Sequence, residues 1–143
     1  MKKLLFLIIC LLAANGLTQA QNYDAAVGIR FGFPTGITYK QFMGGNTAFE
    51  VIVGGGDKGG SVTALIEFHS EVLDQSLNVF YGLGGHIGTW RSDLNVGVDG
   101  IFGLELSTSS PIVMAIDIKP TVFLWRSDIR TSTGGAFSLR YSF

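Results

Sequence analysis

Two histidines in this chain have neighbours that could take part in catalysis. Hydrolytic catalysis by a triad needs a serine, a histidine and a carboxylate within hydrogen-bond reach of one another. His69 is followed by Ser70, but successive residues of a strand point to opposite faces, so this pair cannot readily share a proton. His86 and Asp99 supply half of a triad, yet glycines occupy the facing positions. We therefore expect interior histidines and no enzyme activity.

The other motifs for cofactors and metals are incomplete. The stretch GGGDKG at 54–59 has the spelling G-x-G-x-x-G, but a dinucleotide site needs a helix to follow, and a strand pattern follows here. The only cysteine, Cys10, lies in an N-terminal apolar run, so the rest of the chain offers no sulfur ligand. His69 and His86 are expected near opposite ends of neighbouring strands. We expect no cofactor and no metal.

The tetrapeptide WRSD occurs at 90–93 and again at 125–128. Each copy follows a segment with strand alternation, so both are expected at the same rim of a sheet. Tryptophan suits the boundary between lipid and water, and arginine suits phosphate groups. Strict alternation turns both tryptophans inward, so they either cap the mouth or are turned outward by a bulge. The candidate outer-rim contacts, for lipopolysaccharide or a host ligand, are Trp90, Arg91, Trp125 and Arg126, with Arg130 as a further phosphate-facing candidate.

The elements that must position these residues begin after an export signal. Two lysines precede an apolar run, and a short polar stretch then ends at Ala20, which is typical of a secretory signal peptide. The run is too short to span about 30 Å of hydrocarbon. We predict a signal peptide over 1–20 and one domain over 21–143. That domain carries no basic patch, so nucleic acid is not expected as a partner.

Within this domain, apolar residues recur at every second position in eight segments separated by turn-forming residues. Most segments have about the 9–11 residues that a tilted strand needs to cross a bilayer. The sequence therefore predicts an all-β fold, and an even number of strands brings both ends to one side. The loops at 33–35, 55–60, 90–94 and 125–134 are expected at the other side. The predicted strands are 23–32, 36–42, 47–54, 61–70, 77–89, 95–106, 112–124 and 135–143.

Charge separates the two faces of these strands. Every charged strand residue falls on the parity opposite to the apolar residues, and many glycines share the charged face. A soluble barrel with an apolar interior is the alternative, but so many charges among glycines make a poor apolar cavity. We therefore expect the inverted arrangement, with the apolar face toward lipid and the sheet closed so that no edge is unpaired. The residues on the charged face are Asp24, Arg30, Lys40, Glu50, Glu67, His69, His86, Asp99, Glu105, Asp117, Lys119 and Arg140.

The final segment, AFSLRYSF, alternates Phe137, Leu139, Tyr141 and the terminal Phe143. It resembles the C-terminal signal by which the barrel assembly machinery recognises outer-membrane barrels. Further segments resemble parts of the outer-membrane protein beta-barrel domain family, in the OmpA/OmpX size class: GIRFGFPTGITYK (28–40), YGLGGHIG (81–88), VDGIFGLE (98–105) and DIKP (117–120). The resemblance implies a closed eight-stranded antiparallel up-and-down transmembrane β-barrel in a bacterial outer membrane, and it implies no chemistry.

The charged interior is predicted to be a structural network of opposite charges. The tightest hairpin registers set Lys40 opposite Glu50, Asp99 opposite Lys119 and Asp117 opposite Arg140. The same registers set His86 opposite Asp99. Pairing is expected because an unpaired charge in a confined interior is costly. The predicted network comprises Arg30, Lys40, Glu50, Glu67, His86, Asp99, Glu105, Asp117, Lys119 and Arg140.

These expectations define a functional hypothesis. The chain is expected to be an integral outer-membrane protein with a structural or surface-interaction role, whose partners are outer-membrane lipids and lipopolysaccharide, with the assembly machinery during biogenesis. A monomer is expected. A small solute or ion pore and a lipid-modifying enzyme are the alternatives, although an eight-stranded barrel is only just wide enough for its own side chains.

Overall fold

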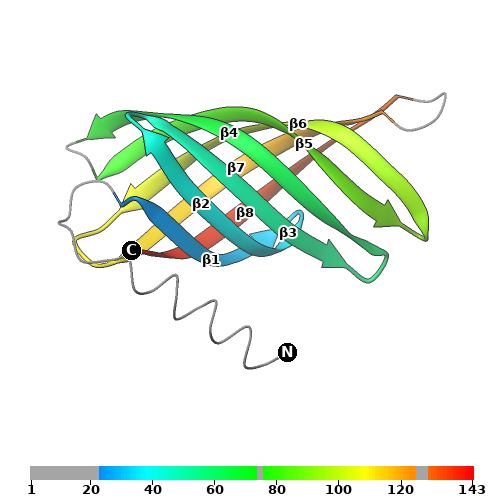
Figure 1. The fold of residues 1–143 in the computed structure, drawn as a ribbon, viewed down its shortest axis with the longest axis horizontal. Helices are drawn as coiled ribbons and strands as arrows, with labels where there is room; N and C mark the ends of the chain where they lie inside the picture. Colours follow the sequence, from blue (N-terminus) through cyan, green and yellow to red (C-terminus); the bar gives the residue numbers. More distant parts are fainter. Residues whose placement is uncertain (1–22, 74–75, 125–128) are drawn as a thin grey trace.

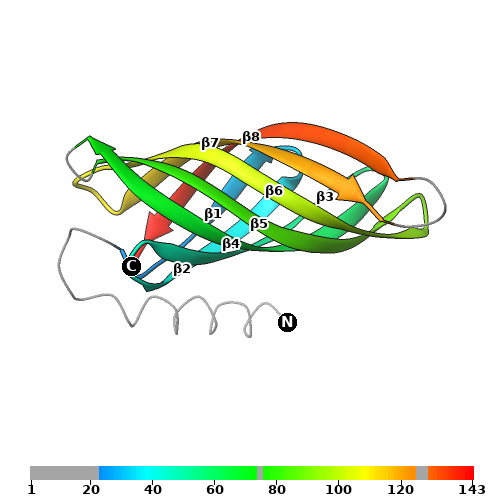
Figure 2. The ribbon, with the colours of Figure 1, turned by 90° about the horizontal axis from the view of Figure 1, so that it is seen from above.

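A computed structural model of the chain describes residues 23–73, 76–124 and 129–143. These residues form a closed barrel in which each strand pairs with the next and β8 pairs with β1 (Figures 1 and 2). All pairs are antiparallel, which confirms the predicted eight-stranded closed barrel. The strands are β1 (Ala25–Gly32), β2 (Thr35–Gly44), β3 (Thr47–Gly56), β4 (Gly59–Leu73), β5 (Leu77–Trp90), β6 (Asp93–Ser107), β7 (Ile112–Phe123) and β8 (Arg130–Ser142). The described residues include no helix that is long and apolar enough to cross a membrane.

The barrel has two distinguishable ends. The start of β1 and the end of β8 lie together, where Ala25 and Phe143 exchange backbone hydrogen bonds of 3.2 and 2.9 Å. The turns after β2, β4 and β6 lie at this same end, here called the near end (Figure 1). The turns after β1, β3, β5 and β7 point the other way and define the far end. The predicted signal peptide, 1–20, lies outside the described residues.

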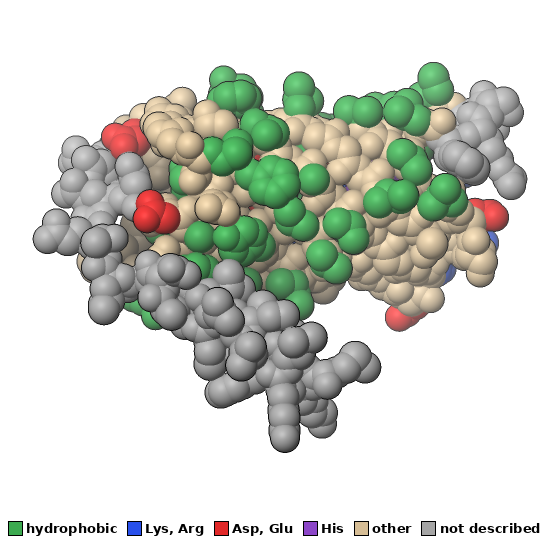
Figure 3. All heavy atoms as spheres, in the orientation of Figure 1, with side chains coloured by type: hydrophobic (Ala, Val, Ile, Leu, Met, Phe, Trp, Pro, Cys, Tyr) green, Lys and Arg blue, Asp and Glu red, His purple; other side chains and the backbone are tan. Residues whose placement is uncertain are grey.

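The two faces of the wall have opposite chemistry. Large hydrophobic side chains such as Leu83, Val98 and Ile118 are 46–70% exposed on the outer surface, whereas Arg30, Lys40 and Glu50 are fully buried inside. Hydrophobic side chains spread over the middle of the visible surface, and charged ones appear toward its ends (Figure 3). The predicted orientation of the two faces is thus confirmed.

Glycines on the inward face allow neighbouring strands to approach closely. A side chain at Gly28 would overlap the backbone of Leu139, and one at Gly84 would overlap the backbone of Ala64. These positions exclude any side chain because the clash is with backbone, which cannot move aside as a flexible side chain could. The glycines therefore serve the tight closure of the wall.

Most strand bounds differ from the predicted ones by a few residues, and two differences change the connections at the far end. β8 begins at Arg130 and not at 135, because the polar residues at its start carry no apolar alternation from which a strand could be read. The β5–β6 connection is a turn of Arg91 and Ser92, with φ of 50° and 72°. Positive φ at both central residues is the geometry of a tight hairpin turn. Neither residue is the glycine or asparagine by which such a turn is usually recognised.

The observed connections shift three of the four predicted facing pairs. Lys40 does face Glu50, as predicted. The other three pairings are wrong, because the predicted registers assumed other turn lengths. The partners observed are His86 with Gly97, Asp99 with Thr121, and Asp117 with Ala136.

Candidate functional site

The structure places all ten residues of the predicted network inside the barrel, each 0–7% exposed. Asp24, which shares their parity, instead precedes β1 and is exposed, because the wall has not yet begun there. The buried charges fall into three groups along the lumen. Two groups cross the lumen between strands that are not neighbours, and one follows adjacent strands.

The group toward the near end is a continuous set of ion pairs, here called the near network: Lys40, Glu50, Glu67, Glu105 and Arg140. The Lys40 Nζ lies 2.7 Å from Glu67 Oε2 and 3.0 Å from Glu105 Oε2. Arg140 donates to Glu50, and its Nη1 lies 3.3 Å from Glu105 Oε2. These contacts link β2, β3, β4, β6 and β8, so the network spans the lumen.

Further groups that the sequence prediction missed complete the near network. The Tyr23 hydroxyl donates to Glu105 Oε1 at 2.6 Å, and Thr38 donates to Glu50. Lys40 Nζ also lies 4.4 Å from the centre of the Phe80 ring, a cation–π contact. Thr38 lies two positions before Lys40, so the alternation places its side chain inside the barrel as well. An uncharged residue indicates the inward face less clearly than a charged one does.

The second group is a single ion pair that also crosses between non-adjacent strands. Arg30 on β1 donates from Nη1 and Nη2 to the two oxygens of Asp117 on β7, both at 2.6 Å. The predicted partner of Asp117 was Arg140, which instead serves the near network. Bidentate pairing fixes the geometry of both side chains, so this pair bridges β1 and β7 across β8.

The third group lies toward the far end and is here called the far network: His86, Asp99, Lys119 and Thr121. Asp99 Oδ2 lies 2.7 Å from His86 Nδ1, and Asp99 Oδ1 accepts from Lys119 at 2.7 Å and from Thr121 at 2.6 Å. His86 Nε2 lies 2.7 Å from Asn95 Oδ1. The strands involved, β5, β6 and β7, are consecutive, and diagonal neighbours make these contacts despite the shifted register.

Apolar side chains also lie inside the barrel, which the sequence prediction did not include. They form a cluster of buried residues with inward parity on β3, β4, β5, β6 and β7. This cluster adds apolar filling to the charged interior, so the lumen is packed by side chains of both kinds. Its members are Ile52, Leu65, Phe80, Ile101 and Ala115.

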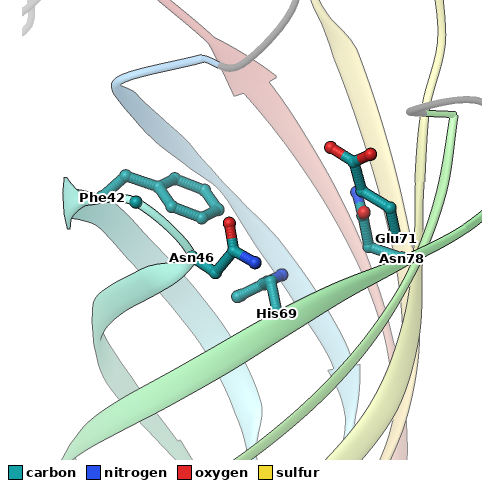
Figure 4. Close-up of a pocket in the computed structure, with 6 residues that line it drawn as sticks. Phe42, Asn46, His69, Glu71 and Asn78 are labelled. Carbon is teal, nitrogen blue, oxygen red and sulfur yellow. The ribbon is translucent and has the colours of Figure 1, made fainter.

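A small pocket of about 20 Å³ opens at the near end (Figure 4). Phe42, Asn46, Glu71 and Asn78 line it together with His69. The His69 ring stacks on Phe80 at 5.3 Å between centroids, and its Nε2 lies 3.3 Å from Glu67 Oε2. The volume is about that of one water position, so the pocket does not accommodate a larger solute.

The far rim carries the first WRSD copy. Trp90 ends β5 and is 47% exposed, and the Lys58 Nζ of the β3–β4 turn lies 5.6 Å from the centre of its ring. The β5–β6 pairing runs to Trp90 without a register shift, so no bulge turns this residue. Arg91 is exposed in the turn, and its N–H donates to the Lys58 carbonyl oxygen at 2.7 Å. Trp125 and Arg126 lie outside the described residues.

Within residues 23–73, 76–124 and 129–143, no group of three or more His, Cys, Asp or Glu side chains could hold a metal ion. Comparison with models of protein families and with curated proteins gave no match.

Proposed function

We propose that this chain is an integral outer-membrane β-barrel protein of a bacterium with two membranes (Gram-negative), with a structural or surface-interaction role. The observation that carries the proposal is the inversion of the two faces. Charged side chains fill the closed interior, while side chains such as Ile37, Leu83 and Ile118 are 53–70% exposed outside. Lipid is the solvent in which such an exterior is stable.

A soluble barrel is disfavoured by the same observation. Soluble monomers rarely expose contiguous apolar patches of more than a few hundred Å², whereas here exposed apolar residues occur on all eight strands. The closed sheet also suits hydrocarbon, because a paired wall leaves few backbone groups that would be costly to bury there.

The packed lumen favours a structural role over a pore. The near network spans the barrel with fully buried ion pairs, and the apolar cluster fills part of the remaining space. An interior that is only just wide enough for its own side chains disfavours a continuous aqueous path. Catalysis is likewise disfavoured at His86, whose ring nitrogens face Asp99 and Asn95 and whose neighbouring hydroxyl, Thr121, donates to Asp99.

The last strand supports the proposed route of assembly. Phe137, Leu139 and Tyr141 are exposed on the outer face of β8, and Phe143 follows its end. This row of outward aromatic and apolar side chains resembles the signal read by the barrel assembly machinery. We propose that the machinery is a transient partner, that lipopolysaccharide is a partner at the rim that carries Arg91, and that residues 1–20 direct export.

The proposal is tested by electrophoresis of the detergent-purified protein with and without boiling, together with insertion into phospholipid vesicles. We expect the unboiled protein to migrate differently from the boiled one and to float with the vesicles. A protein that stays in plain buffer without detergent and does not bind vesicles would contradict membrane insertion. Stable conductance steps in a planar bilayer would favour the pore over the structural role.

A further inference from the structure

Over the first part of its length, β8 is paired with a neighbouring strand on one side and not on the other. β8 pairs with β7 from Arg130 onward, whereas its ladder with β1 ends where Ala136 faces Gly32. One further bond joins the Phe33 N–H to the Gly135 carbonyl oxygen at 3.1 Å. The β1–β2 turn stops well short of the tips of the other hairpins at the far end (Figure 1). Apart from this bond at Gly135, residues 130–135, here called the β8 edge, therefore face no strand on the β1 side within the described part of the chain.

The register shows which backbone groups point into this gap. In an antiparallel ladder, alternate residues direct their N–H and C=O groups to the same side. Phe143 bonds to Ala25, and Gly135 accepts from Phe33, so the odd-numbered residues of β8 face β1. Thr131 and Thr133 therefore direct their backbone groups away from β7 and into the gap, and both residues are exposed.

The β8 edge lacks the features that usually prevent pairing with another chain. Edge strands are commonly protected by charges, proline or a bulge. Here the sequence is RTSTGG, whose only charge is Arg130 at its end, and the β7–β8 ladder runs without a register shift. At about 3.4 Å per residue the edge is about 20 Å long, the length of an ordinary strand. Its threonines favour β-pairing.

We propose that the β8 edge is a docking site for an extended segment of a different polypeptide, which adds to the wall as an extra strand and places a carboxylate near Arg130. Unpaired backbone groups of a strand are complementary to the backbone of another extended chain. The exposed guanidinium of Arg130 selects for an acidic residue at one end of that segment. The proposal depends on the strand register and not on membrane insertion, so it can fail while the proposed function stands.

The test uses the full mature chain, folded in detergent, and a blocked six-residue peptide of alternating threonine and valine that ends in glutamate. Amide hydrogen exchange is followed residue by residue by NMR. We expect saturating peptide to slow exchange of the Thr131 and Thr133 amides at least tenfold. The Ser132 amide, which faces β7, is the internal control and should change less than twofold. Unchanged exchange at Thr131 and Thr133 in millimolar peptide would overturn the proposal.

Matched variants separate the backbone from the side chain. Thr133→Pro removes the N–H that faces the gap and leaves the bonds to β7, which use even-numbered residues, so peptide affinity should fall at least tenfold. Thr133→Val keeps the N–H and should bind within twofold of the wild type. Equal affinity of the proline and valine variants would contradict backbone pairing. Dimers that form without peptide and disappear in Thr133→Pro would identify a second copy as the occupant and overturn the proposal of a different polypeptide.

Discussion

The near and far networks use the same kinds of side chain in different ways. The near network joins strands on opposite walls, as when Arg140 of β8 binds Glu50 of β3. The far network follows consecutive strands, from His86 of β5 through Asp99 of β6 to Lys119 of β7. The near network is also sealed from solvent, with side chains 0–1% exposed, whereas His86 and Lys119 are each 5% exposed.

This difference indicates that the two networks stabilise the barrel in different ways. Bonds across the lumen hold the closed cross-section, because they tie walls that no backbone ladder joins directly. Bonds along the wall reinforce ladders that already exist between β5, β6 and β7. Loss of a charge should therefore be most damaging in the near network, whose charged side chains are the more deeply buried.

The largest effect is expected from Arg140→Met. Arg140 is the common partner of Glu50 and Glu105, and its removal leaves buried carboxylates with too little positive charge. Breaking a buried ion pair by removing one partner costs about 3–5 kcal/mol. Urea unfolding in phospholipid vesicles measures this change.

The control for this prediction is Arg130→Met at the exposed start of β8, which should change the free energy of unfolding by less than about 0.5 kcal/mol. Similar losses in both variants would mean that the near network contributes no more than a surface charge. The Arg140→Met, Glu50→Gln double variant should recover part of the loss, because one uncompensated carboxylate is removed with its partner.

The comparison also explains which contacts the sequence could predict. Hairpin reasoning compares consecutive strands, so it anticipated that Asp99 would meet His86 and Lys119, and it set Lys40 opposite Glu50. It could not anticipate Arg30 with Asp117, because β1 and β7 are separated by β8 and their approach depends on closure and stagger of the whole sheet. The alternation of apolar and polar residues along a strand predicts which face of the wall each side chain lies on. It does not predict which side chain it contacts across the lumen.

Other features of the fold could not be predicted because the local sequence pattern does not distinguish them. The start of β8 is polar on both faces, since it lies at the rim, so nothing in RTSTGG distinguishes strand from loop. The β5–β6 turn uses Arg91 and Ser92 at positive φ without a glycine. Inward apolar residues such as Ile52 and Phe80 fill space between charges, a packing requirement that appears only once the strands surround a common lumen.

The second largest effect is expected on the outer face beside the far network. Val98 and Asp99 are consecutive on β6, but Val98 is 46% exposed outside while Asp99 is fully buried. Val98→Arg should cost about 2–4 kcal/mol in vesicles, the cost of a cation facing the middle of the bilayer. Val98→Leu is the matched control and should cost less than about 1 kcal/mol. An arginine as well tolerated as leucine would mean that this face does not meet lipid.

A smaller loss is expected from Lys119→Met in the far network. Asp99 keeps its contacts with His86 and Thr121, so it is not left without partners, and the loss should be about 1–2 kcal/mol. Unfolding in vesicles, in parallel with Arg140→Met, gives the direct comparison of the two networks. If Lys119→Met lowers the free energy of unfolding as much as Arg140→Met or more, the near network does not stabilise the barrel more than the far network does.

The smallest effect is expected from Tyr23→Phe, at the entrance to the near network. Loss of the hydroxyl removes one hydrogen bond to Glu105 and should cost about 1 kcal/mol at neutral pH. Burial and the nearby Glu105 carboxylate raise the pKa of the Tyr23 phenol well above its usual value. The folded protein therefore holds this proton more tightly than the unfolded chain, in which the phenol has a pKa of about 10.

The sign of the pH dependence follows from that difference. The stability contributed by the raised pKa is fully present below about pH 10 and is lost as the pH rises toward the pKa of the folded state. The free energy of unfolding of the wild type should therefore fall more steeply between about pH 10 and pH 11 than that of Tyr23→Phe, which has no phenol at this position. Parallel curves would mean that Tyr23 titrates as freely in the barrel as in the unfolded chain, and that the near network is open to water at this end.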